Sequence, residues 1–100
     1  MGSDATVLVD DGAAYDDGTV AAVRVLSVPK SDRFPNGIKH KFHYGEVGAE
    51  NPIIRFDNHH GIHELHLGSD TYEIEFCGLE ETYEIWRGAL PPEKRNDWQP

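Results

Sequence analysis

The stretch Ile53-Ile-Arg-Phe-Asp-Asn-His-His-Gly-Ile-His-Glu-Leu-His66 decides the fold of this chain. It contains two short runs, residues 52–58 and 62–67, whose composition is typical of β-strands. His60-Gly61 lies between the two runs and provides residue types that favour a tight turn. The stretch therefore predicts an antiparallel β-hairpin.

The length of that turn decides which side chains face each other across the hairpin. A turn of two residues, or a loop of four, places Phe56 opposite Leu65. The apolar face then carries Ile54, Phe56, Leu65 and Leu67, and the polar face carries Arg55, Asp57, Glu64 and His66, with His59 at its rim. A three-residue turn would shift the pairing by one residue and exchange the two faces. We expect the apolar set to be buried and the polar set to be exposed.

The sequence on either side of this hairpin predicts further strands. Residues 38–44 alternate strictly, with Ile38, His40, Phe42 and Tyr44 on one side and Lys39, Lys41 and His43 on the other. Beside the hairpin, with its apolar side toward the core, this strand adds its two lysines and His43 to the polar face. Residues 6–10, 19–28 and 71–76 also read as strands, with a turn at Asp10-Asp11-Gly12 after the first of them.

After the last predicted strand, the apolar pattern changes to that of a helix. Leu79, Tyr83, Trp86 and Leu90 recur at steps of four, three and four, which makes one helical stripe. Gly88 and Pro91-Pro92 end the helix. Residues 1–90 then form a single domain, and residues 91–100 form a polar tail that we expect to be mobile. The sequence predicts an α+β fold, an antiparallel meander of five or six strands with one C-terminal helix packed on one face.

Composition limits the partners that the surface can attract. The chain has 100 residues, 18 of them acidic and 9 basic, and a net charge of −9. An acidic surface repels nucleic acid at long range, so RNA could bind only where the few cations share one face. The acidity also fits a halophilic host, because carboxylates keep proteins hydrated in a salty cytoplasm.

The cellular compartment follows from the cysteine count and the apolar runs. Cys77 is the only cysteine, which excludes an intramolecular disulfide and fits a reducing compartment. We expect it to be a small buried side chain rather than a nucleophile. Residues 1–11 are neither basic nor continuously apolar, and every apolar run falls far below the ~20 residues of a membrane helix. We therefore expect a cytoplasmic protein without a signal peptide and without membrane association.

All six histidines fall between His40 and His66. The ordinary pKa of histidine, ~6.5, suits proton transfer at neutral pH, and imidazole is a common metal ligand. A lone surface histidine rarely has a role, but the set on the polar face is accompanied by Asp57 opposite Glu64. Two facing carboxylates are mildly destabilising unless a cation or a shared proton relieves them. Such a local cost is expected at a functional site.

Three chemistries fit the polar face, and the residues leave all three open. In metal-free cleavage of RNA, one histidine removes the 2′-hydroxyl proton, another protonates the leaving oxygen, and Arg or Lys stabilises the phosphorane. In the second, Asp57, Glu64 and imidazoles bind a divalent metal such as Mn, Zn or Ni. In the third, the face has no chemistry and only docks a partner.

Three segments of the chain resemble the TumE-like toxins of prokaryotic toxin–antitoxin pairs. They are Gly37–Tyr44 (GIKHKFHY), Ile53–Gly61 (IIRFDNHHG) and His63–His66 (HELH). An early strand that runs into Val28-Pro29 and a C-terminal helix extend the resemblance over residues 6–90. The resemblance implies a small toxin neutralised by a cognate helix-turn-helix antitoxin, and the analogy with other small toxins suggests RNA as the target.

The resemblance also marks candidate site residues, namely Lys39, Lys41, Arg55, Asp57, Asn58, His60, His63 and His66. On this hypothesis the chain is a ribonuclease in which the three marked histidines supply the acid and the base. The two lysines, the arginine and the asparagine bind the substrate, and Asp57 orients a histidine or binds a divalent metal. The implied partners are the antitoxin, RNA and, in a homodimer, a second copy of the chain. The rival hypothesis is a non-enzymatic binding module whose His and acidic face only docks a protein.

Overall fold

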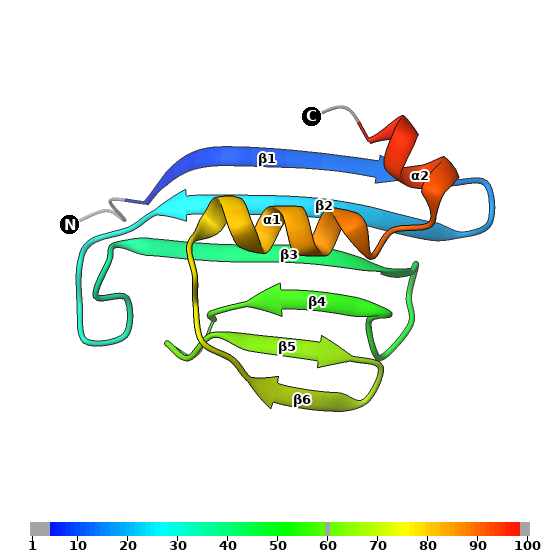
Figure 1. The fold of residues 1–100 in the computed structure, drawn as a ribbon. Helices are drawn as coiled ribbons and strands as arrows, with labels where there is room; N and C mark the ends of the chain where they lie inside the picture. The colour runs from blue at the N-terminus through cyan, green and yellow to red at the C-terminus, as the bar shows by residue number, and fades with distance from the viewer. Residues whose placement is uncertain (1–4, 60, 99–100) are drawn as a thin grey trace.

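The computed structural model of the chain describes residues 5–59 and 61–98. Over these ranges the fold is one six-stranded sheet with two helices (Figure 1). The strands are β1 (Thr6–Ala14), β2 (Thr19–Ser27), β3 (Ile38–Glu46), β4 (Ile54–Asp57), β5 (Glu64–Leu67) and β6 (Asp70–Glu73), and the helices are α1 (Leu79–Gly88) and α2 (Pro92–Asp97). Each strand pairs antiparallel with the next one in sequence. The predicted α+β meander is confirmed.

The first strand is longer than the sequence predicts. The turn expected at Asp10-Asp11-Gly12 is wrong, because these residues pair with β2 and the strand continues to Ala14. The chain reverses only at Gly18, which has a φ of 85° that favours glycine. Pairing along a whole neighbouring strand here outweighs a local turn preference.

The central hairpin has the predicted register. Phe56 pairs with Leu65, Arg55 with His66, and Asp57 with Glu64. The two strands are shorter than expected, so residues 58–63 form the connection, in which the Gly61 N–H donates to the Asn58 carbonyl oxygen at 2.9 Å. The connection has six residues, an even number like the two or four residues that the sequence predicts. The same side chains therefore face each other, and the two faces of the hairpin are not exchanged.

One face of the sheet packs on α1 and forms the core. Buried residues of this core are Ala21, Val23, Val25, Phe42, Tyr44, Ile54, Phe56, Trp86, Leu90 and Trp98. The rings of Phe42 and Trp86 lie 6.1 Å apart between β3 and α1. Because α1 contacts β3 and β4, the outer strands are less covered. Leu65 packs against the core but is only partly buried, and Leu67 is 42% exposed, so the expected place of Leu67 in the core is wrong.

The chain after α1 continues into a second helix over the residues that the structure describes. Pro92 begins α2, and Trp98 beyond it is 4% exposed and packs edge-on against Trp86 at 5.2 Å. The Trp98 Nε1–H donates to the Tyr83 hydroxyl at 2.9 Å. The sequence pattern misses this element because one aromatic residue in a charged segment carries no periodicity.

A buried lysine fixes α2 to the sheet. The Lys94 ammonium donates to the Asp17 carboxylate, to the Thr19 hydroxyl at 2.8 Å and to the Tyr44 hydroxyl at 2.7 Å. The hydrogen bond from Lys94 lowers the pKa of Asp17 to about 2.

Cys77 is exposed in the segment before α1, so its predicted burial is wrong.

The face of the sheet opposite α1 is polar, and we call it the open face. Strand alternation and register place Arg24 of β2, Lys39, Lys41 and His43 of β3, Arg55 and Asp57 of β4, Glu64 and His66 of β5, and Thr71 and Glu73 of β6 on this face. Neither helix in the described part of the chain packs there (Figure 1). The predicted gathering of scarce cations on one sheet surface is confirmed.

Candidate functional site

The histidines of the central stretch divide between the two faces of the sheet. His43 and His66 lie on the open face, and His59 lines a small hollow there with Lys39 and Lys41. His40 and His63 lie on the side of the core. His60 falls outside the described residues. The candidate site is therefore the open face, and only part of the predicted histidine set belongs to it.

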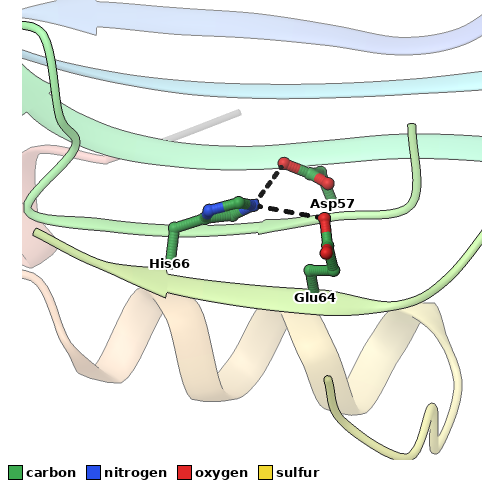
Figure 2. A group of neighbouring side chains, drawn as sticks. All are labelled: Asp57, Glu64 and His66. Carbon is green, nitrogen blue, oxygen red and sulfur yellow. Dashed lines mark ion pairs between the residues drawn. The ribbon is translucent and has the colours of Figure 1, made fainter. Parts of the chain in front are cut away.

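The centre of the open face is a cluster of Asp57, Glu64 and His66 (Figure 2). The His66 Nε2 atom lies 3.2 Å from Asp57 Oδ2 and 3.6 Å from Glu64 Oε1. Asp57 is only 3% exposed, so its predicted exposure is wrong. Its neighbours on β3 and β5 enclose it, although it points to the polar side of the sheet.

Strand geometry explains why these three side chains meet. The β4–β5 register places Asp57 directly opposite Glu64, and His66 follows two residues later on the same face. On the far side, Thr71 of β6 pairs with His66, and its Oγ1 lies 3.1 Å from His66 Nδ1. The imidazole is thus held at one nitrogen while the other is directed at the carboxylates.

The cluster has the donors of a metal site. One ligand atom from each of Asp57, Glu64 and His66 lies within 4.8 Å of the others. Two carboxylate oxygens and one imidazole nitrogen are ligands that Mn and Zn accept. The same contacts also allow Asp57 to orient His66 for proton transfer, so the arrangement fits both chemistries that the sequence suggested.

Cations surround the cluster on the open face. Arg55 Nη1 lies 3.9 Å from Asp57 Oδ2, and Lys41 is the β3 partner of the same aspartate. The Arg55 Nε–H also donates to His43 Nδ1 at 3.4 Å. Burial, followed by the charges of Arg55 and Lys41, lowers the pKa of His43, which keeps this imidazole a neutral acceptor.

His59 lies at the edge of this charged surface. It lines a hollow of about 80 Å³ together with Arg24, Leu26, Lys39, His40 and Lys41. Burial lowers the pKa of His59, Asp57 opposes that shift, and nearby cations add to it. The structure therefore places His59 at the rim of the polar face, as the sequence predicts.

The pair on the core side has a different environment. His40 Nε2 lies 3.2 Å from His63 Nδ1, and the His63 ring stacks on Phe76 at 4.1 Å. Burial, followed by the neighbouring His63, lowers the pKa of His40 to about 4, and burial lowers that of His63. The predicted grouping of His63 with His66 and Asp57 is not what the structure shows, because strand alternation turns His63 to the opposite face.

Asn58 holds two strands together rather than facing the open surface. Its Oδ1 accepts the His40 backbone N–H at 2.8 Å, and its Nδ2 donates to the Ile38 carbonyl oxygen at 2.8 Å. Because Asn58 is buried and both ends of its amide are used, the structure gives it a place in the scaffold instead of the predicted substrate contact.

The open face also contains Arg24, which the sequence did not place there, and His43, which the sequence placed on the polar face but not among the candidate site residues. Arg24 pairs with Lys41 across β2 and β3, and His43 pairs with Arg55 across β3 and β4. A usable signal was present, because Arg24 is the only charged residue in the run 19–28. Pairing that run with residues 38–44 would have placed it beside the lysines.

Comparison with known proteins identifies the family. The model of the family described as toxin TumE matches residues 3–89. No match was found among curated proteins or among solved structures. Within the described residues, no helix is long and apolar enough to span a membrane. Because the match covers all six strands and α1, the chain belongs to the toxin TumE family, which brings with it a toxin role and an antitoxin as partner.

Proposed function

We propose that this toxin cleaves RNA on the open face of its sheet. The observation that carries the proposal is the distribution of cations on an acidic chain with only 9 Lys and Arg residues. Four of them, Arg24, Lys39, Lys41 and Arg55, share the open face with the Asp57–Glu64–His66 cluster. Cations gathered in this way attract a phosphodiester backbone despite an unfavourable net charge.

The chemistry of cleavage needs three functions, and the open face offers groups for each. A base removes the proton of the 2′-hydroxyl, whose oxygen then attacks phosphorus. The bond from phosphorus to the 5′-oxygen breaks, an acid protonates that oxygen, and a 2′,3′-cyclic phosphate forms. Arg55 and the lysines stabilise the charge on the phosphorane. His59 and His66, and His60 as predicted from sequence alone, are the imidazoles proposed for proton transfer.

Asp57 has the positioning role in this proposal. It lies 3.2 Å from His66 and holds the imidazole at the centre of the face, either for proton transfer or as one part of a metal site. His63 and Asn58 are not included, since both are engaged on the other side of the sheet. We expect the toxin to act in the cytoplasm, where its RNA substrates are made.

The test is a cleavage assay on the purified chain with a synthetic RNA and the DNA of the same sequence. The expected result is cleavage of RNA with 2′,3′-cyclic phosphate ends and no cleavage of DNA, which lacks the attacking hydroxyl. Production of the chain alone should slow growth, and co-production of a helix-turn-helix antitoxin should restore it. Growth arrest with intact cellular RNA would overturn the proposed reaction while leaving the toxin role in place.

A binding module that only docks a protein partner is the second candidate. Leu67 and Tyr72 are exposed apolar side chains of β5 and β6 on the helix side of the sheet, beyond the strands that α1 covers, and would suit a protein partner such as the antitoxin or a second copy. If the purified chain binds a partner tightly but cleaves no RNA, this candidate is favoured. Sedimentation of the isolated chain would show whether a homodimer forms.

A further inference from the structure

We propose that Asp57, Glu64 and His66 bind one divalent cation, Mn²⁺ or Zn²⁺. Figure 2 shows the three side chains converging from β4 and β5, with the His66 imidazole directed between the two carboxylates. The proposal deepens the function proposed above, since it names a cofactor of the same face. The binding itself does not depend on RNA cleavage.

The spacing of the three donor atoms fits a single cation. A tetrahedral ion about 2.1 Å from each ligand atom separates its ligands by about 3.4 Å. The observed separations are 3.2 Å from His66 Nε2 to Asp57 Oδ2 and 3.6 Å from His66 Nε2 to Glu64 Oε1. The carboxylate oxygens of Asp57 and Glu64 also lie within 4.8 Å of each other. Small side-chain rotations therefore suffice to complete the geometry.

The electrostatics of the cluster favour a cation. Asp57 is buried and faces Glu64 directly across the antiparallel pair, where two negative charges repel each other. Arg55 reaches Asp57 only at 3.9 Å, so it offsets this repulsion weakly. A divalent ion between the carboxylates would remove the repulsion and satisfy both groups.

The His66 imidazole gives an independent indication. Its Nε2 is a buried atom without a hydrogen-bond partner, although it points at two carboxylates. Its Nδ1 lies 3.1 Å from the Thr71 hydroxyl oxygen, which can accept an Nδ1–H. That tautomer leaves the Nε2 lone pair free for a metal, and an outer hydrogen bond of this kind is typical of metal-bound histidines.

The donor set limits the identity of the cation. Mg²⁺ and Ca²⁺ prefer oxygen ligands alone, whereas a nitrogen with two carboxylates suits Mn²⁺ and Zn²⁺. Three protein ligands leave a position for a substrate oxygen, as in catalytic sites. His66 is then a ligand rather than a proton carrier, and the bound ion would act on the phosphate as a Lewis acid.

The experiment is titration of the metal-free chain with Mn²⁺, followed by electron paramagnetic resonance, and with Zn²⁺, followed by calorimetry. We expect one ion per chain. Glu64→Gln should raise the dissociation constant at least tenfold, and Asp57→Asn should raise it further. Glu73→Gln is the matched control, because Glu73 is the β6 neighbour of Glu64 and lies outside the cluster. The far-ultraviolet spectrum and melting temperature of each variant verify folding.

Two results would overturn the metal site. One is the absence of saturable binding of either ion at millimolar concentration, and the other is equal weakening by Glu73→Gln and Glu64→Gln. The RNA assay separates the two proposals. Metal binding without RNA cleavage removes the proposed reaction and keeps the site, while RNA cleavage by a chain that shows no saturable binding of either ion removes the site and keeps the reaction.

Discussion

His40 and His66 lie on opposite faces of the same sheet and have opposite surroundings. His40 is 2% exposed, contacts another imidazole and has a pKa lowered to about 4, so it stays neutral in the folded protein. His66 meets the carboxylates of Asp57 and Glu64 on a surface that no described helix covers. The same residue type thus contributes to the scaffold on one face and to a reactive cluster on the other.

This difference shows that enrichment in histidine locates a site but does not assign its members. The helix-covered face should control stability with little effect on chemistry, because its groups pack against each other. The open face should control chemistry with little effect on stability, because truncation of partly exposed side chains usually changes stability within about 0.5 kcal/mol. Single substitutions on the two faces test this division.

His66→Ala should have the largest effect on activity. We expect the rate of RNA cleavage to fall by about 10²- to 10⁴-fold, because the change removes either a proton carrier or a metal ligand. Since His66 lies on the face of the sheet opposite the core, the denaturation midpoint should remain close to that of the parent protein. Single-turnover cleavage and urea unfolding measure the two quantities.

His63→Ala is the matched change on the other face. It removes the stack on Phe76 and the contact with His40, so stability should fall while the rate per folded molecule stays nearly constant. If His63→Ala abolishes cleavage in a protein that remains folded, the division of the histidines by face is wrong.

Trp98→Ala should have the largest effect on stability. A buried Trp replaced by Ala usually loses about 3–5 kcal/mol, and Trp98 packs on Trp86 and donates to the Tyr83 hydroxyl. Trp98→Phe, which keeps the ring and loses only the donor, should cost much less. Urea denaturation gives both values. A loss below 1 kcal/mol in Trp98→Ala would show that the segment after α1 adds little to the core.

Much of the fold could be predicted because two periodicities were clear. The alternation of residues 38–44 placed Phe42 toward the core and Lys41 away from it, and the structure agrees. The hairpin register followed from an even-numbered connection, although its actual length differs. Strand parity therefore determined the open face, including Asp57 opposite Glu64.

The remaining features depend on contacts that no local pattern encodes. His63 lies just before β5, continues the alternation of Leu65 and contacts His40 and Phe76 on the core side, whereas the family resemblance had grouped it with His66. Asn58 looked like a site residue, yet its amide bonds to the β3 backbone. The packing of Trp98 depends on a helix that begins at the second of two prolines and returns the chain to the core, which composition alone cannot predict.

The buried imidazole of His40 should make stability fall in acid. Its pKa is 6.5 when exposed and about 4 in the fold, where burial acts first and His63 second, while Asp57 opposes both. The unfolded chain therefore binds the proton first as the pH falls. The stability contributed by neutral His40 is complete above pH 6.5 and is lost progressively down to about pH 4.

The size of this loss should be about 3 kcal/mol between pH 7 and pH 4. His40→Phe should flatten the dependence over that range, because Phe fits beside Phe42 and Phe76 and cannot be protonated. Urea denaturation of the parent protein and of His40→Phe at several pH values measures the free energy of unfolding. An unchanged pH dependence in His40→Phe would assign the acid sensitivity to other groups.

The smallest predicted effect concerns the cations of the open face and follows from their exposure. Lys41→Gln and Arg24→Gln should each weaken binding of single-stranded RNA only a few-fold at low salt. Each should also lower the slope of log affinity against log salt by about 0.7, the value for one lost phosphate contact. Arg87→Gln, on α1 at the other face, removes the same charge and should leave the slope unchanged. Equal changes of the slope in all three variants would mean that RNA affinity depends on the net charge of the chain. The open face would then not be the RNA-binding surface.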